Sequence, residues 1–587
     1  MSDSYASLVA DSNWIRLIPF EYTVRNVKAD HFTNSLVQQH QLLRHHKFSK
    51  KVHVGMVIFD CDKARLQHTV ESILLQTALN FNVVFVVEQD IDKSHIKGFI
   101  SSRLQRDAYT AEMFVDRISF ATSVSEAIRA NVLSDYVCFA RYGDIFEPCF
   151  VAMISLECER SLDPADIYIW NECIFDHADN VRILKVVHKP ELEPYTFLHY
   201  NYVSYAFAAT PALISDAEEF ELLLRNSDGH LFLLPLAMNN KVKWATIPHS
   251  LMLRDVWNSR PFREVAASCL EMYKQVVSDR FELRELHGTD APYSLMPFAD
   301  TPDISVIILF RDRPELTEEA ILSVLRQDVT ASLEIVLVNN QSRMETVERL
   351  TAFIKKTIST KVSIRLIDYD RPFNHSAQCN LASKEAKGDV LVFLNNDAKF
   401  VSPDALTEMA AWAVMPCIGT VGAKLVDAQG SLVSAGIRLR GTFGEAFHSP
   451  AEESMDANYA SFNRETWGNS FACTAMSTKT FETVGPLDEL NFPSGYNDVQ
   501  YSARCHRASL INMYLGTKVV VHSPGTSRGR SDEVYQKVLL KRQFPELAHE
   551  SLFQLGTRTN FTKKKPYGYL AVIRTGIRKI LYWLSAK

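Results

Sequence analysis

The chain repeats one order of apolar and polar segments at a spacing of about 250 residues. Four short apolar runs define the repeat, in two pairs: 52–58 and 82–87, then 304–310 and 333–340. Val87 and Val338 are 251 positions apart, and Asp144 and Asp397 are 253 apart. A nearly constant offset over so long a stretch indicates an internal duplication. The chain is therefore expected to fold as two copies of one architecture.

Each copy runs in the order strand, helix, strand, helix, strand, which predicts an α/β fold with a mostly parallel sheet. In such sheets ligands bind beyond the carboxyl ends of the strands, so each copy has a site at the same topological place. The predicted organisation is a helical extension at 1–47, a first α/β domain at 48–284, a linker at 285–303, a second α/β domain at 304–545 and a tail at 546–587.

Composition narrows the class of protein. A chain of 587 residues has room for two large α/β domains. The net charge of −6 argues against a nucleic-acid partner. The 10 cysteines include no C-x-x-C pair, which favours reduced thiols over a zinc site or disulfides. The first residues lack a secretory pattern, and no apolar run is long enough to span a bilayer. We therefore expect a cytoplasmic protein.

The tail has a composition of its own. From Phe561 to Lys587 it holds seven Lys or Arg and no acidic residue, with apolar residues at helical spacing between Leu570 and Leu584. A basic amphipathic helix of this kind is typical of segments that bind an anionic membrane surface. The expected location is therefore peripheral, at the inner face of the cell membrane. The alternative is a helix packed on the second domain.

Three polar residues end one of the apolar strands. In "LVFLNNDAKF" the apolar run stops at Asn395, Asn396 and Asp397. A carboxylate at the tip of a buried parallel strand lies where ligands bind, and carboxylate oxygens suit Mg²⁺ or Mn²⁺ that hold a diphosphate. The alternative is a turn-forming Asn-Asn-Asp without a ligand.

Several longer motifs carry a family resemblance. The stretch "ISVIILFRDRPELTEEAILSVLRQDVTASLEIVLVNNQS" resembles the opening of a family 2 glycosyltransferase of the GT-A fold. The stretches "YDRPFNHSAQCNLASKEAKGDVLVFLNNDAKF", "VGAKLVDAQGSLVSAGI", "GPLDELNFPSGYNDVQYSARCHRA" and "VVVHSPGTSRG" are similar to bacterial enzymes that build surface polysaccharides, including rhamnosyltransferase-like proteins. The resemblance covers roughly residues 300–535 and depends on the motifs as a set.

The resemblance implies a donor site in the second copy. Asp397 matches the last position of the family's D-x-D-like motif and would hold the metal and, through it, the diphosphate of a nucleotide-sugar. Asn395 and Asn396 precede it in the same motif. Asn340, where the family usually has Asp, would hydrogen-bond the nucleobase, since an amide both donates and accepts. His522 would complete the metal site, although a lone His is more often structural.

The resemblance also implies catalytic and acceptor residues. Asp498 matches the catalytic carboxylate, which takes the proton of the acceptor hydroxyl in an inverting transfer; the alternative is a helix N-cap. Arg528 and Arg530 would bind the diphosphate, or are solvated loop charges. Trp467 and Tyr496 would line the acceptor site, or belong to the core.

The first copy keeps less of this chemistry. Its string "ARYGD" has Arg141 and Gly143 in place of acidic residues and keeps only Asp144. The position of the metal-type His falls near Leu253, whereas Asp228 can still match the base. We expect a degenerate GT-A-like domain that no longer performs metal-dependent transfer. A second active transferase with a metal-free site is the alternative.

The function implied by the resemblance is sugar transfer from a nucleotide-sugar to a glycan or lipid-linked glycan. A nucleotidyltransferase also places carboxylates at strand ends, but it usually has a Gly-rich loop after the first strand, and "LFRDRPELT" has no glycine. A glycan-binding scaffold without catalysis is the third possibility. It is favoured only if Asp397 and Asp498 do not converge in space.

Overall fold

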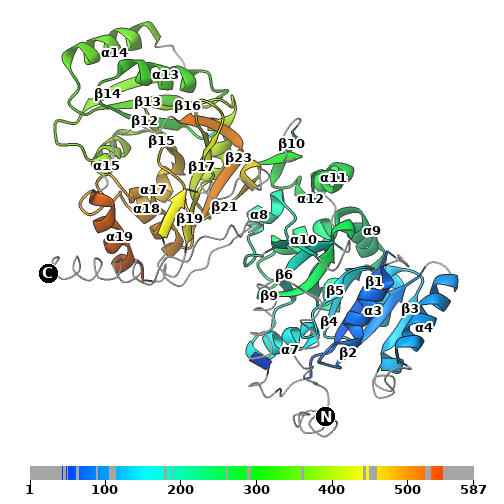
Figure 1. Cartoon of the computed structure of the whole chain (residues 1–587). Coiled ribbons are helices and arrows are strands. Elements are labelled where there is room, and N and C mark those ends of the chain that lie inside the picture. The colour runs from blue at the N-terminus through cyan, green and yellow to red at the C-terminus, as the bar shows by residue number, and fades with distance from the viewer. Residues whose placement is uncertain are drawn as a thin grey trace, which may run out of the picture.

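A computed structural model shows two α/β domains that follow one another along the chain (Figure 1). The structure describes residues 42–43, 48 and 51–545, apart from segments at 61–64, 88–89, 105–113, 177–181, 188, 259–261, 287–291, 358–361, 441–444, 449–458 and 523–530. The predicted extension at 1–47 and the tail at 546–587 fall almost entirely outside the described residues. Among the described residues, no helix is long and apolar enough to cross a membrane.

The first domain is built on a mixed sheet with strand order β3-β2-β1-β4-β8-β6-β9-β5, to which β7 adds beside β6. Its strands are β1 (Val54–Phe59), β2 (Phe81–Val86), β3 (Ile118–Ala121), β4 (Tyr136–Arg141), β5 (Ile145–Phe146), β6 (Ile167–Asp176), β7 (Arg182–Val187), β8 (Phe207–Ala209) and β9 (Trp244–Asp255). Its helices are α3 (Leu66–Leu74), α4 (Asp90–Leu104), α6 (Val124–Ala130), α7 (Phe150–Arg160), α8 (Pro194–His199), α9 (Ala217–Ser227), α10 (His230–Ala237), α11 (Phe262–Ser268) and α12 (Leu270–Val277).

The second domain repeats this topology strand for strand, in the order β14-β13-β12-β15-β22-β17-β23-β16, with β18 beside β17 and β21 beside β23. Its strands are β12 (Ile304–Phe310), β13 (Leu333–Asn339), β14 (Val362–Asp368), β15 (Val390–Asn395), β16 (Ala398–Phe400), β17 (Ile418–Val426), β18 (Leu432–Ser434), β21 (Asn463–Thr466), β22 (Cys473–Ser477) and β23 (Ile511–His522). A separate hairpin joins β19 (Ile437–Arg440) and β20 (Glu445–His448). Its helices are α13 (Pro314–Leu325), α14 (Met344–Thr357), α15 (His375–Glu385), α16 (Ala405–Ala413), α17 (Thr478–Val484), α18 (Asn497–Arg507) and α19 (Ser531–Gln543).

The apolar runs form the parallel half of each sheet. In the second domain β12 pairs in parallel with both β13 and β15, and every residue of β13 is buried. Burial on both faces explains why these strands read as continuous apolar runs without alternation. The other half is mixed, because β22 lies antiparallel between β15 and β17. The prediction of two tandem α/β units with mostly parallel sheets is confirmed.

The segment between the domains is folded. Residues 285–303, which the sequence indicates as a linker, include β11 (Tyr293–Pro297), which pairs antiparallel with β10 (Phe281–Glu285). The side chains of Tyr293 and Leu295 are buried. The described part of this segment therefore contains a strand that packs against the end of the first domain.

Candidate active site

Asp397 and His522 lie together at one edge of the second sheet. The imidazole Nε2 of His522 is 3.3 Å from Oδ1 of Asp397, and the two side chains are 13% and 18% exposed. His522 Nδ1 is buried and has no hydrogen-bond partner among the described residues. The pair therefore presents a carboxylate and an imidazole at a partly open position.

The strand pairing explains this contact. Asp397 lies in the turn between β15 and β16, and β16 runs antiparallel to the end of β23. In that register Ala398 is opposite His522, so the residue just before Ala398 comes beside the imidazole. Asp397 and His522 are more than a hundred residues apart in sequence, and they meet because each lies at the end of a buried strand.

Asn340 follows β13 and is 2% exposed. Its Nδ2 donates to the carbonyl oxygens of Tyr369 and Arg371, at 3.2 and 2.9 Å. Its Oδ1 is buried and has no hydrogen-bond partner within the described part of the chain. The Nδ2 atom is thus held by two carbonyls, and the Oδ1 atom keeps unused acceptor capacity.

The two asparagines before Asp397 have separate environments. Asn395 ends β15, and its backbone N–H donates to the carbonyl of Ala472 at 3.0 Å. Asn396 Nδ2 donates weakly to Thr317 Oγ1, 3.4 Å away on α13. Both side chains are half-buried, so they flank Asp397 without being enclosed by the core.

Asp498 lies in the first turn of α18, where it is 7% exposed. Tyr496 is the N-cap residue, so Asp498 does not take the capping position that the sequence left open. Its Oδ1 accepts a hydrogen bond from the Val499 N–H at 2.9 Å. An acidic side chain in the first turn of a helix interacts favourably with the helix dipole.

An aromatic cluster links this helix to the strand that carries Asp397. Phe471 stacks on Phe393 of β15 with ring centroids 5.5 Å apart and contacts Tyr501 of α18 at 5.8 Å. Phe393 lies four residues before Asp397, and Tyr501 lies three residues after Asp498. The strand end and the helix start are therefore packed on one shared cluster.

The two aromatic residues expected at the acceptor site differ in exposure. Trp467 is 4% exposed and packs in a hydrophobic cluster with Phe492 and Val499. Of the two positions that the sequence left open for Trp467, this burial fits the core position. Tyr496 is half-buried, with φ of 54°, and the Nζ of Lys537 lies 5.7 Å from its ring centroid.

His375, to which the sequence argument gave no role, contacts the helix that carries Asp498. Its Nδ1 lies 2.9 Å from Nδ2 of Asn497, the residue before Asp498, and the ring is half-buried at the start of α15. The signal was present, because His375 belongs to the quoted stretch "FNHS". Arg528 and Arg530, expected to bind the diphosphate, lie outside the described residues.

In the first domain an arginine occupies the corresponding strand end. Arg141 ends β4, and its guanidinium lies 2.9 Å from the carboxylate of Asp60 and 2.8 Å from that of Asp228. The guanidinium also lies over the rings of Phe59 and Tyr205. Asp228, which the sequence matched to the base, is thus bound to an internal cation.

Asp144, the remaining acid of this string, is fully buried and fully bonded. Its Oδ1 accepts from the Asp255 N–H and from Asn258 Nδ2, and its Oδ2 accepts from the Arg141 N–H and the Tyr205 hydroxyl, all within 2.9–3.1 Å. Burial raises the pKa of Asp144. In the second domain Ala398 of β16 pairs with His522 of β23. In the first domain the equivalent pair is Ile145 of β5 and Leu253 of β9, so a leucine takes the place of the imidazole.

These contacts predict that Asp144→Ala lowers stability and leaves transfer nearly unchanged. Four donors lose their acceptor, and each buried unpaired donor costs about 1–3 kcal/mol, so the melting temperature of the first domain is expected to fall by roughly 10 °C or more. Thermal unfolding and transfer measured well below the melting temperature test this, with the exposed Asp163→Ala as control. A loss of transfer at low temperature as large as that of Asp397→Ala would make the first domain catalytic.

The residues of the second domain fit a divalent cation bound together with a diphosphate. Among the described residues, no group of three or more His, Cys, Asp or Glu side chains can hold a metal. Mg²⁺ is commonly held by one or two carboxylates with substrate phosphates and water completing its shell, and Mn²⁺ also accepts imidazole. Asp397 with His522 suits this shared mode and does not suit a metal site closed by protein ligands.

A family comparison agrees with this geometry. Residues 305–482, which include β12 through α17 and Asp397, match the model of Glycosyl transferase family 2. The matched part of the second domain is therefore similar to family 2 of the glycosyltransferases.

Two curated relatives were found. The chain is 21% identical over 521 residues to the uncharacterized protein y4gI of Sinorhizobium fredii, covering 86% of this chain and 56% of that protein. It is 30% identical over 243 residues to the O-antigen biosynthesis protein RfbC of Myxococcus xanthus, covering 40% of this chain and 18% of that protein. The chain thus spans about half the length of the first relative and under a fifth of the second.

Among solved structures, the chain is similar to GalNAc-T7 with UDP, GalNAc and Mn²⁺, with a TM-score of 0.35 and 15% identity over 44% of this chain and 51% of that chain. It is also similar to the mannosyltransferase PcManGT of Pyrobaculum calidifontis in complex with GDP-Man and Mn²⁺, with a TM-score of 0.33 and 16% identity over 43% of this chain and 69% of that chain.

Proposed function

We propose that the chain is an inverting glycosyltransferase that moves a hexose-type sugar from a nucleotide-sugar to a glycan or lipid-linked glycan in bacterial surface polysaccharide synthesis. Catalysis belongs to the second domain. The observation that carries the proposal is the Asp397–His522 pair at the sheet edge of a domain similar to family 2, with Asp498 on a helix that packs on the same aromatic cluster.

In this proposal Asp498 is the general base. It takes the proton from the acceptor hydroxyl as that oxygen attacks the anomeric carbon, while the bond from this carbon to the diphosphate oxygen breaks. The nucleoside diphosphate leaves with the electron pair of that bond. The transfer inverts the anomeric carbon because it occurs in one displacement, and no covalent sugar intermediate is required.

The donor is bound by the residues at the strand ends. Asn340 offers its Oδ1 to the nucleobase, Asn395 stands where the family's first Asp often touches the ribose, and Asn396 lies between Asn395 and Asp397. Asp397 and His522 would hold Mg²⁺ or Mn²⁺, which supplies positive charge against the diphosphate as it leaves. Arg528 and Arg530 follow His522 by a few residues and are proposed to contact the same diphosphate. Tyr496, two residues before the general base Asp498 in the sequence, is proposed to contact the acceptor.

The first domain is proposed to be non-catalytic. Arg141 occupies the strand end and is paired with the carboxylates of Asp60 and Asp228, so an internal cation already uses these carboxylates. The alternative of a metal-free transferase there requires a free carboxylate. Asp228 and Asp144 are both engaged by internal donors.

A donor screen tests the proposed function. The full chain is incubated with UDP-, GDP- and dTDP-sugars and either Mg²⁺ or Mn²⁺, and nucleoside diphosphate release is measured, with water as acceptor if no sugar acceptor is supplied. We expect release from one nucleotide class only, dependent on the metal. Release of pyrophosphate from a nucleoside triphosphate and a sugar phosphate would instead identify a nucleotidyltransferase.

We further predict that the tail holds the protein at an anionic membrane surface. Each Lys or Arg near anionic lipid contributes about 1 kcal/mol, and the apolar stripe with Tyr582 and Trp583 can insert at the headgroup boundary. Sedimentation with vesicles containing anionic lipid compares the full chain with a truncation ending at Thr559. The full chain is expected to bind at low salt and to dissociate as salt rises. Equal sedimentation of both would exclude the anchor.

A further inference from the structure

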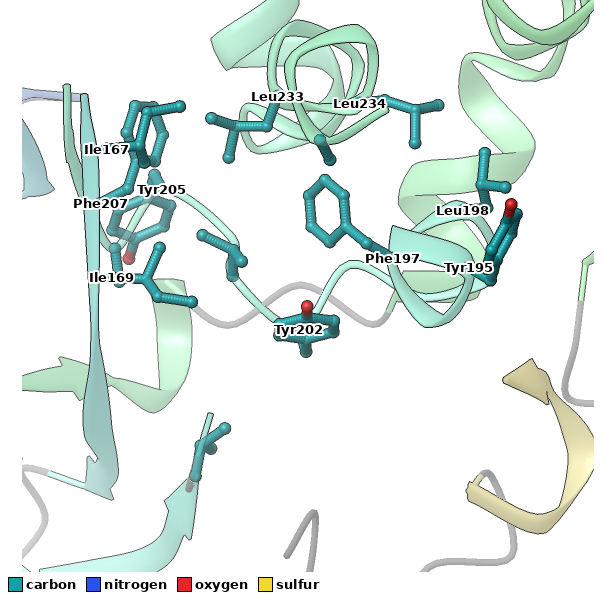
Figure 2. Close-up of a cluster of buried hydrophobic side chains, with 14 of the residues drawn as sticks. Ile167, Ile169, Tyr195, Phe197, Leu198, Tyr202, Tyr205, Phe207, Leu233 and Leu234 are labelled. Atoms are coloured by element: carbon teal, nitrogen blue, oxygen red, sulfur yellow. The ribbon is translucent and has the colours of Figure 1, made fainter. Parts of the chain in front are cut away.

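Helix α8 of the first domain lies between the two domains (Figure 1). One side of it is anchored in the first domain, where the ring of Phe197 contacts that of His230 at 4.6 Å and the Phe197 carbonyl lies 2.6 Å from His230 Nε2. Figure 2 shows Phe197 pointing from this helix into the buried cluster, while Tyr195 and Leu198 lie on its other side. The helix is thus a fixed part of the first domain with one side left for another contact.

That other side binds strand β21 of the second domain. The Tyr195 N–H donates to Glu465 Oε1 at 2.8 Å, and the Glu465 N–H donates to Thr196 Oγ1 at 2.9 Å. The Thr196 hydroxyl in turn donates to Oε2 of Glu193 at 2.7 Å. These bonds join residues about 270 positions apart and pair both the side chain and the backbone of Glu465 with α8.

Apolar packing surrounds this polar junction. The ring of Tyr195 meets that of Trp412 edge to face, with centroids 5.5 Å apart, and Trp412 is 0% exposed. Phe281 of β10 also contacts Trp412, at 5.7 Å. Buried side chains from both domains share one hydrophobic cluster. A junction of this kind holds the two domains in one arrangement and does not act as a loose hinge.

Strand β21 continues directly into Trp467, which holds the helix of the proposed base. The Trp467 carbonyl accepts from His506 Nε2 at 2.7 Å and from Asn512 Nδ2 at 2.9 Å. Its ring lies in the same buried cluster as Val499, the residue after Asp498. His506 lies in the last turn of α18, so Trp467 contacts the helix near both of its ends.

We propose that the first domain is a positioning domain for the second, and that Glu465 is the positioning residue through which α8 fixes β21, Trp467 and the orientation of α18. The proposal rests on the proposed function, because it assigns the role through Asp498. In this role the first domain needs no nucleotide-sugar of its own, because it acts by orienting Asp498 toward the acceptor hydroxyl.

The competing explanation is that the interface only stabilises the fold. Substitutions of Glu465 distinguish this explanation from the positioning role. Burial and the neighbouring Glu193 raise the pKa of Glu465 well above its usual range, and burial raises the pKa of Glu193 to about 7. A protonated carboxyl group resembles an amide in shape, and the Oε1 of a glutamine still accepts the Tyr195 N–H. Glu465→Gln therefore keeps the contact, whereas Glu465→Ala removes it.

The test compares these two variants in the full chain, with the donor found by the screen. For Glu465→Ala we expect kcat to fall by about 10-fold or more, since small errors in the placement of a catalytic group are costly, while the donor Kd from calorimetry stays within about twofold. Glu465→Gln is expected to restore kcat to within about threefold of the wild type. Thr196→Val, which removes the acceptor of the Glu465 N–H and the donor to Glu193 but keeps the Glu465 side chain, is the milder second variant if Glu465→Ala does not fold, and its kcat is expected to be intermediate.

Hydrogen exchange of the α18 amides tests the positioning role without requiring catalysis, so its outcome does not depend on the proposed function. Faster exchange of the α18 amides in Glu465→Ala, but not in Glu465→Gln, supports positioning even if no donor is turned over. Unchanged exchange of α18 together with wild-type kcat in Glu465→Ala would overturn the proposal. A fall in kcat that Glu465→Gln does not restore would also overturn it.

Discussion

Replacing Asp498 by Asn is expected to lower kcat by a factor of about 10²–10⁴ with little change in donor affinity. The amide keeps the size of the carboxylate, and its oxygen still accepts the Val499 N–H that Oδ1 accepts at 2.9 Å. It cannot take the proton of the acceptor hydroxyl. The loss should therefore appear in turnover, measured by nucleoside diphosphate release, and not in calorimetric binding of the donor.

The matched control is Glu345→Gln, which removes an acid from the first turn of α14 at an exposed position. Both variants remove a favourable charge–dipole interaction of similar kind, so a small loss of stability is common to them. Only Asp498→Asn is expected to lose turnover. Lost donor affinity with normal turnover would contradict the role of Asp498 as the base.

Replacing Asp397 by Ala is expected to remove metal-dependent transfer, with a loss of about 10²–10³ or more in kcat, because the charge that balances the leaving diphosphate is lost. Chelation of divalent ions with EDTA should reduce the wild type to the same level and should not affect the variant further. The control is Asp389→Ala, an exposed acid just before the opposite end of the same strand, β15. If Asp397→Ala retained metal-stimulated release, the assignment of this carboxylate as a ligand would be wrong.

The parallel half of each sheet was predictable from local pattern. Strands such as β12 and β13 are buried on both faces, and this burial produces the apolar runs whose offset indicates the duplication. The sequence also placed Asp397 and His522 at the ends of apolar strands, so both were expected at the same edge of the sheet. The contact between them depends on the pairing of β16 with β23, which no local pattern in the sequence specifies.

The remaining features depend on contacts between distant residues. The hydrogen bond from Tyr195 to Glu465 joins two ordinary-looking segments, and neither has a composition that indicates an interface. The hairpin of β10 and β11 was hidden by the Pro and polar residues around Tyr293. Trp467 shows the limit of composition, since an aromatic residue beside a site motif is equally suited to a ligand contact or to packing. Here its ring is buried against α18.

The first domain shows how a degenerate site is recognised. Sequence comparison of the copies indicated the loss of acidic residues at Arg141 and Gly143, but it could not show what replaced them. The structure shows that Arg141 binds Asp60 and Asp228 and that Asp144 accepts four hydrogen bonds. These residues form part of an internal polar network of the first domain.

The most direct measurement of the central proposal is the release of nucleoside diphosphate from the selected donor by the wild type and by Asp397→Ala, each with Mn²⁺ or Mg²⁺ and again with EDTA. The proposal predicts release by the wild type with metal only, and release near background by Asp397→Ala under every condition. Equal release by the two proteins, or release by the wild type that EDTA does not reduce, would contradict metal-dependent transfer at Asp397 in the second domain.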